Sequence, residues 1–165
     1  MPKLIKDGAV TDDHWQLIDK DAVLTASDID GEKQLLLPLS LWLALREEMT
    51  AGENIGVWLD SDEAPSALAD DCQKLALIAI NFPSFADGRG YSYAVTLRQR
   101  YGYRGELRAI GDVLRDQLFF YQRCGFNSYA VRTDCDIDAA LAGLNDFDTC
   151  YQAAQDDTTP LFRKR

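Results

Sequence analysis

The run LALIAINF at residues 75–82 is apolar at every position except Asn81, and this run decides the class of fold. A strand of this composition is covered on both faces, as strands are at the centre of a parallel sheet. Similar runs of apolar and β-branched residues occur at residues 55–59, 106–110 and 128–132. Segments with a helical pattern lie between or after these runs, at residues 64–73, 90–101, 112–124 and 136–147. The alternation predicts an α/β fold with a small, mostly parallel sheet of β-α units.

The first 50 residues have a different pattern and predict a mixed β/α segment that forms a lid or an edge of the sheet. Asp7-Gly8 is typical of the bend of a hairpin, and residues 22–26 predict a strand. The apolar run after Pro38 predicts a helix with Ser40 as its N-cap. Four β-α units make half of a closed eight-stranded barrel. We therefore expect an open or half-barrel-like sheet, unless the N-terminal segment or a homodimer partner covers its edge.

The length of 165 residues fits a single domain, which we assign to residues 1–155. Within it, residues 1–50 form the N-terminal segment and residues 51–155 form the repeated units. Residues 156–165 predict a flexible C-terminal tail, and ordinary fraying of a terminus is one explanation for it. The other explanation is a short docking motif for a partner, made of Leu161, Phe162, Arg163, Lys164 and Arg165.

The composition argues against several classes of protein. No apolar run approaches the roughly 18 residues that span a bilayer, and none has the length of a signal peptide, so we expect a cytoplasmic protein. The four cysteines are widely spaced without a CxxC pair, and His14 is the single histidine, which together predict no metal site. The chain has no dinucleotide fingerprint, no cluster cysteines and no haem-attachment motif, so no cofactor is expected.

Charge is distributed unevenly along the chain. Residues 1–88 carry a net charge of −11, residues 89–132 carry +5, and residues 133–165 carry −4, for a total of −10. All cations in the central block are arginines. An acidic protein with one confined basic segment does not suit nucleic acid or an anionic membrane, which need a broad basic face. A small anion, or an acidic patch on a partner protein, suits it better.

The turn after residues 75–82 is the first candidate site. It runs PSFADGRGYS at residues 83–92 and opens the next predicted helix, where open α/β sheets bind their ligands. Gly88 and Gly90 free the backbone to bend, Asp87 or Ser92 could cap the helix, and Arg89 could complete an anion cradle. A tight turn whose glycines serve geometry alone explains the same residues.

Two later turns repeat this arrangement. Arg108 is followed by Gly111 and Asp112, and Arg132 is followed by Thr133 and Asp134. Because the ends of neighbouring parallel strands lie about 5 Å apart, these side chains could converge on a site with Asp87 and Arg89. Arg89, Gly90, Ser92, Arg108 and Arg132 would then bind an oxyanion or a partner, and Asp87 or Asp112 would be the best catalytic candidates. The alternative is a lattice of ion pairs in which the arginines bind Asp87, Glu106, Asp112 and Asp116 and need no ligand.

The order FPxFxDGRGYSxAxxLRxRxGYxGELRAxGDVxxDQ at residues 82–117, followed by RCGF, resembles the bacterial family catalogued as domain of unknown function 934. Members of that family are commonly labelled probable oxidoreductases of sulfite reduction, because their genes lie beside that of the assimilatory sulfite reductase. The resemblance implies a pathway, sulfate assimilation and cysteine biosynthesis, and no chemistry.

Two functions fit the resemblance and the residues. The first is an accessory protein that binds the sulfite reductase haemoprotein and assists its activity or its supply of electrons. The second is a small enzyme that holds a sulfur or phosphorus oxyanion at the arginine-lined strand ends. An enzyme should direct these groups into a void, whereas a binding protein should pair them internally and expose its aromatic side chains.

Overall fold

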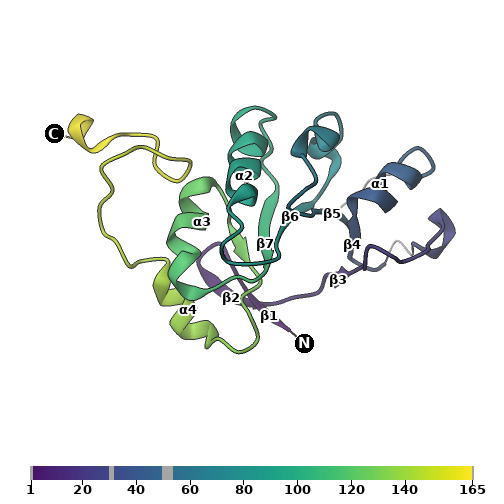
Figure 1. Ribbon diagram of the computed structural model, residues 1–165, viewed down its shortest axis with the longest axis horizontal. Coiled ribbons are helices and arrows are strands. Elements are labelled where there is room, and N and C mark those ends of the chain that lie inside the picture. The colour runs from purple at the N-terminus through teal and green to yellow at the C-terminus, as the bar shows by residue number, and fades with distance from the viewer. Residues whose placement is uncertain (1, 30–31, 50–53, 165) are drawn as a thin grey trace.

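The computed structural model describes residues 2–29, 32–49 and 54–164, and Figure 1 shows their arrangement. Eight strands form one curled sheet in the order β2-β1-β8-β7-β6-β5-β4-β3. Neighbouring strands from β3 to β8 pair in parallel, whereas β1 pairs antiparallel with both β2 and β8. The predicted α/β fold, a mostly parallel half-barrel-like sheet with a mixed N-terminal segment, is confirmed.

The centre of the sheet agrees with the sequence pattern. β5 (Ile55–Leu59), β6 (Leu77–Phe82) and β7 (Glu106–Gly111) lie where strands were predicted. β8 (Ser128–Tyr129) is shorter than the predicted 128–132. Its neighbour β7 ends at Gly111, and the Arg132 amide donates instead to Val113 O beyond that strand (3.1 Å). The ladder between β7 and β8 therefore ends at Ala109 and Tyr129, two residues before β7 itself ends.

The N-terminal segment contributes strands to both edges of the sheet. β1 (Lys3–Lys6) and β2 (Ala9–Asp12) form the predicted hairpin, with Asp7 at φ 49° and Gly8 at φ 79°, as a two-residue type I′ turn requires. β3 (Gln16–Leu17) and β4 (Leu35–Pro38) were not predicted, and they extend the opposite edge beside β5. The edges are covered by this segment, which was one of the expected alternatives.

Two predictions for the N-terminal segment were wrong. Residues 22–26 form no strand, because Thr25 caps the 3₁₀ turn η1 (Ala26–Asp28) through hydrogen bonds to the Asp28 carboxylate (2.6 and 2.8 Å). Helix α1 (Leu39–Leu45) does follow Pro38, but Pro38 is its N-cap and Ser40 lies inside the helix. The leucines before Pro38 belong to β4.

The helices are fewer and shorter than predicted. α2 (Arg89–Gln99) matches its predicted segment, and α4 (Ile137–Gly143) ends four residues early. The segment 112–124 holds the 3₁₀ turn η4 (Arg115–Gln117) and then α3 (Leu118–Cys124). The segment 64–73 is not a helix but two 3₁₀ turns, η2 (Pro65–Leu68) and η3 (Cys72–Lys74). The backbone amides of Ala69, Asp71 and Lys74 each donate to the carbonyl three residues back, as in 3₁₀ turns. The Asp71 carboxylate between the two turns is bound by Arg46 (2.8 Å) and Lys74 (3.0 Å).

The two faces of the sheet are covered differently. α1, α2 and α3 pack on one face and build the main core, in which Trp42, Leu97 and Tyr121 are buried. On the opposite face, here called the inner face, a smaller cluster is formed by Leu36, Trp58, Leu77, Ala79 and Ile110. The segment between β2 and β3 crosses below the sheet in Figure 1, and its Trp15 packs against this cluster. Within the described ranges, no helix has the length and apolar character needed to cross a membrane.

Candidate functional site

The carboxyl ends of the parallel strands carry three groups of paired charges. The first follows β5, where the Asp60 carboxylate accepts hydrogen bonds from Lys20 Nζ (2.7 Å) and from Asn81 Nδ2 (3.0 Å). Burial raises the pKa of Asp60, but these hydrogen bonds and the Lys20 charge outweigh it, so the pKa lies below its usual range. Asn81, the polar residue of the central strand, is therefore bound to a fixed carboxylate.

The loop between β6 and α2 holds the second group. Arg89 donates to both oxygens of Asp87 (3.0 and 2.7 Å) and to Ser61 Oγ (2.9 Å). The hydrogen bond from Arg89 holds the pKa of Asp87 well below its usual range. Asp87 also accepts from the Arg89 amide (3.2 Å), and it thus satisfies a backbone donor at the helix start. The predicted catalytic carboxylate and the predicted anion-binding arginine are bound to each other.

Gly90 and Ser92, the other predicted ligands on this loop, have structural surroundings. A Cβ on Gly90 would lie 2.6 Å from Phe82 Cζ, so the glycine permits close packing of α2 on β6. Ser92 lies inside the exposed part of α2, and its carbonyl accepts from Thr96 Oγ1 (2.9 Å).

The third group joins three loops. The Asp112 carboxylate accepts from the Phe85 amide (2.8 Å) and from Arg132 Nη1 (2.8 Å). Arg132 also binds both oxygens of Asp134 (2.9 and 2.5 Å). Hydrogen bonds from Arg132 and the Phe85 amide lower the pKa of Asp112, and the two carboxylates raise the pKa of Arg132, first through Asp134. Asp112 thus ties the loop after β6 to the loop after β8.

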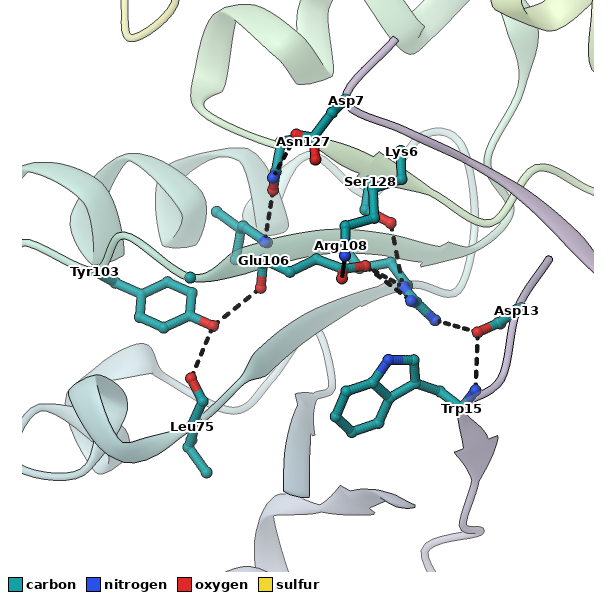
Figure 2. A network of polar contacts seen from close by, with 12 residues as sticks. Lys6, Asp7, Asp13, Trp15, Leu75, Tyr103, Glu106, Arg108, Asn127 and Ser128 are labelled. Atoms are coloured by element: carbon teal, nitrogen blue, oxygen red, sulfur yellow. Dashed lines mark hydrogen bonds and ion pairs between the residues drawn. The ribbon is translucent and has the colours of Figure 1, made fainter. Parts of the chain in front are cut away.

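Arg108 does not reach this end of the sheet. It lies on the inner face, where its guanidinium binds Glu106 Oε1 (2.8 and 3.0 Å), Ser128 Oγ (3.2 Å) and Asp13 Oδ1 (3.0 Å), as Figure 2 shows. The Arg108 side chain is 3% exposed, and Lys6 Nζ lies 2.6 Å from the second oxygen of Glu106. Burial raises the pKa of Glu106, but the Arg108 charge and the Lys6 hydrogen bond bring it below its usual range.

Asp13 belongs to the segment that crosses the inner face, so its bond to Arg108 fastens that segment to β7. Trp15 follows, and its amide donates to Asp13 Oδ1 (3.1 Å). Sequence reasoning missed Asp13, Trp15 and Ser128 as parts of this network. The signal available in the sequence was the spacing of Glu106 and Arg108, because residues two apart in a strand lie on the same face. A charged side chain on a covered face is stable only when it is paired with an opposite charge.

The structure thus places Asp87, Arg89, Asp112 and Arg132 at one end of the sheet and Arg108 on the inner face. Each of the five is engaged by a protein partner. Of the carboxylates in the ion-pair alternative, Asp87, Glu106 and Asp112 bind arginines, whereas Asp116 forms no ion pair among the residues described. Among the described residues, no three His, Cys, Asp or Glu side chains are grouped to hold a metal ion. A pocket of 470 Å³ opens nearby, lined by Leu17, Asp19, Lys20, Asp21, Trp58, Asn81 and Ile110.

Aromatic side chains surround α3, and three of them, Phe85, Phe120 and Phe147, are more than half exposed. Phe120 is 54% exposed and its ring centroid lies 4.7 Å from that of Tyr91, while Phe119 packs at 5.0 Å on Phe147, which is 64% exposed. Phe85, 62% exposed, joins the start of this region through its carbonyl, which accepts from Gln117 Nε2 (3.2 Å). We call these five rings the aromatic surface: Phe85, Tyr91, Phe119, Phe120 and Phe147.

The C-terminal tail is connected to the same region. Arg123 on α3 binds Asp156 (3.0 Å) and donates to the carbonyl of Gln152. Beyond it, Leu161, Phe162 and Arg163 form the 3₁₀ turn η5 (Leu161–Arg163), and Lys164 binds Asp157. Leu161 and Phe162 are exposed, and Figure 1 shows the segment extending away from the sheet. Arg165 lies outside the described residues.

The fold and the candidate site define an α/β half-barrel-like domain in which the charged side chains at the carboxyl ends of the strands pair with one another. Comparison with protein families matches residues 56–162 to the family described as "Bacterial protein of unknown function (DUF934)". Because this match covers more than half of the chain, the protein belongs to that family, as the resemblance indicated. The matched range begins at the second residue of β5 and continues through β8, and it leaves out β1 to β4 and α1. No curated protein and no solved structure matches the chain.

Proposed function

We propose that the protein is a binding module, an accessory protein of assimilatory sulfite reduction that docks on the sulfite reductase haemoprotein and assists its activity or its supply of electrons. The pathway and the partner come from the family resemblance of residues 82–126. The arrangement of the described side chains supports docking as the mode of action. Interface cores are enriched in aromatic residues, and large exposed apolar patches are uncommon on surfaces that bind nothing.

One observation carries the proposal. The predicted catalytic and anion-binding side chains at the strand ends already bind one another, while three phenylalanines of the aromatic surface are more than half exposed. Paired carboxylates with lowered pKa values are poor proton carriers near neutral pH. The enzyme alternative therefore has less support than the docking alternative. The tail residues Leu161, Phe162, Arg163 and Lys164 are a second docking element, because Arg123 attaches their segment to α3.

The test is an affinity purification of the tagged protein from cells that grow on sulfate as sulfur source, analysed by mass spectrometry and by visible absorption. The haemoprotein should elute with the wild-type protein and give its absorption bands. The double variant Phe120→Ser, Phe147→Ser should lose most of it, because central aromatic side chains carry much of the binding energy of an interface, about 2 kcal/mol or more each.

Val23→Ser is the matched control, because Val23 is 93% exposed. It belongs to the segment between β3 and β4, and these strands lie at the edge of the sheet away from α3 (Figure 1). This variant should retain the haemoprotein. A wild-type protein that elutes alone and colourless would contradict the proposal and favour the enzyme alternative. Equal retention by all three proteins would place the docking surface elsewhere, and a tail variant, Phe162→Ser, would then be the next to compare. Sedimentation of the purified protein shows whether the aromatic surface pairs two copies of this chain instead.

A further inference from the structure

Three arginines at the amino ends of the strands have no acidic partner. Six other arginines each lie 3.0 Å or less from a carboxylate oxygen: Arg46, Arg89, Arg108, Arg115, Arg123 and Arg132. In contrast, Arg98, Arg100 and Arg104 form no ion pair within the part of the chain that the structure describes. In a protein with a net charge of −10, unneutralised cations grouped in one place require an explanation.

Arg98, near the end of α2, is the most constrained of the three. Its guanidinium donates to the carbonyls of Gly125 (2.8 Å), Tyr103 (2.8 Å) and Gly105 (2.9 Å), and to Asn127 Oδ1 (3.3 Å). These four acceptors are neutral, so they fix the orientation of the group without an ion pair. The Asp7 carboxylate acts on the Arg98 charge electrostatically but forms no ion pair with it. Burial lowers the pKa of Arg98. Of its five N–H groups, one on Nη2 has no acceptor among the residues described.

The backbone at Gly125 is adapted to this arginine. Gly125 ends α3 with φ 108°, and a Cβ at this position would lie 2.7 Å from Arg98 Cγ. The side chain of Arg98 therefore passes directly over the glycine to reach the strand ends. The arrangement holds one guanidinium firmly in place at the surface of a hollow.

That hollow has a volume of 450 Å³, within the range of small-molecule sites. Arg98 and the exposed Arg104 line it together with the amide side chains of Gln122 and Gln155. Its walls come from distant parts of the chain: the turn of the β1–β2 hairpin, the loop between α2 and β7, the end of α3 and the C-terminal segment.

Two carboxylates also line the hollow, and each has another partner. Asp7 accepts from Asn127 Nδ2 (2.9 Å), and Asp156 is paired with Arg123 (3.0 Å). The positive charges of Arg98, Arg104 and Arg123 thus exceed the negative charges of the two carboxylates by one. A bound anion with one negative charge would balance the group. Amides and guanidinium groups are donors suited to oxygen atoms of anions.

We propose that this hollow at the amino ends of β7 and β8 binds a small oxyanion of the sulfate, phosphate or carboxylate type, with Arg98 and Arg104 as its cationic ligands. This site lies at the opposite end of the sheet from the turns that the sequence pattern favoured. It does not depend on the proposed docking to a partner, because it shares no residue with the aromatic surface.

The experiment is a titration of the full-length ¹⁵N-labelled protein with sodium sulfate, sodium phosphate and sodium citrate, each compared with sodium chloride at equal ionic strength. The amide signals of Gly8, Gly125 and Asn127 and the Nε–H signal of Arg98 should shift and saturate with at least one of the three anions. The anion with the lowest dissociation constant identifies the type of oxyanion.

Arg104→Gln should weaken that binding about tenfold, because a charged hydrogen-bonding partner is lost. Arg104 is exposed and has no partner in the described structure, so its replacement spares the fold. Arg100→Gln is the matched control, because Arg100 is an exposed arginine close by that does not line the hollow, and its variant should bind within twofold of wild type. Shifts that do not saturate with any anion, or saturable binding that Arg104→Gln leaves unchanged, would overturn the proposal. Saturable shifts confined to Arg89 and Arg132 would overturn it in favour of the strand carboxyl ends.

Discussion

Arg108 and Glu106 form a buried ion pair on β7 that two other charged residues complete, Asp13 and Lys6. Arg108→Met would leave Glu106 buried without its main counter-charge, so we expect the free energy of unfolding to fall by about 3 to 5 kcal/mol. Arg115→Met removes the exposed pair with Asp146 and an exposed hydrogen bond to the Ala139 carbonyl (3.0 Å), and it should cost about 1 kcal/mol. Urea unfolding followed by circular dichroism measures both. Similar losses in the two variants would show that burial of the pair has no special weight.

The same pair predicts a dependence of stability on pH. The pKa of Glu106 lies below its ordinary value of 4.5 in the folded protein, so the folded state binds its proton less readily than the unfolded chain does. The resulting stabilisation is present above that value and is lost as the pH falls through the lower, folded pKa. Glu106→Gln should be less stable at neutral pH, yet its unfolding free energy should fall less steeply between about pH 5 and pH 3. Glu48→Gln, on an exposed turn, is the control and should follow the wild-type profile.

The candidate site could be predicted from the sequence only in part, and the reason lies in side-chain direction. The turns at residues 83–92 and 111–112 do lie at the carboxyl ends of β6 and β7, because the strands themselves were readable. The sequence analysis grouped Arg108 with these turns because it comes shortly before Gly111 and Asp112 in the chain. Because side chains alternate along a strand, Arg108 lies on the inner face with Glu106. Its third partner, the Asp13 carboxylate, is far away in sequence and becomes evident only in the folded structure.

At the scale of elements, the turn that ends β7 depends on a glycine. Gly111 has φ 91°, and a Cβ there would lie 2.5 Å from both Asn81 Oδ1 and Phe82 O. Gly111→Ala should therefore cost about 1 kcal/mol for the left-handed backbone and about 1 to 3 kcal/mol more for the clash. Gly8→Ala provides the comparison, because Gly8 has φ 79° and open space around its Cα, so only the first cost applies. Equal thermal midpoints for the two variants would contradict this account of the turn.

Strands and helices that turn residues separate from their neighbours could be predicted from the sequence. Elements without such a boundary could not. β5 and β6 are short, mainly apolar runs, β7 has apolar residues at alternate positions, and turn residues follow all three strands. α2 follows a glycine-rich turn, so these local signals agree with the fold. β4 was missed because Pro38 alone separates its leucines from the leucine-rich start of α1. A strand followed at once by a helix then has the composition of a single helical segment. Residues 22–26 have strand-like composition but no neighbouring strand, and hydrogen bonding to a neighbour is what makes a strand.

At the scale of the whole molecule, the first 20 residues unite the two edges of the sheet. They supply β1 and β2 beside β8, β3 beside β4, and the segment that carries Asp13 and Trp15 across the inner face. Deletion of residues 2–20 removes the buried side chains of Leu4, Ile5 and Ile18, which together contribute about 5 kcal/mol. That amount is comparable to the whole stability of a small domain.

We therefore expect the truncated protein to expose the edge of β8 and to self-associate, as light scattering after size-exclusion chromatography would detect. Deletion of residues 158–165 at the other terminus is the control, because most of the described residues there are exposed, and it should leave the monomer or native oligomer unchanged. A truncated protein of wild-type size and stability would show that the N-terminal strands are dispensable.

The pairing of β1 with β8 also has a consequence for synthesis on the ribosome. Ile5 is opposite Tyr129, so the hairpin that emerges first must wait for one of the last strands before it can join the sheet. At about 5 to 20 residues per second, the 124 residues that follow Ile5 up to and including Tyr129 take roughly 6 to 25 s to translate. During that time the nascent chain keeps an unpaired hairpin and an uncovered apolar sheet face, which are the surfaces that chaperones recognise. Expression of this protein should therefore respond to translation speed and chaperone supply more than its small size suggests.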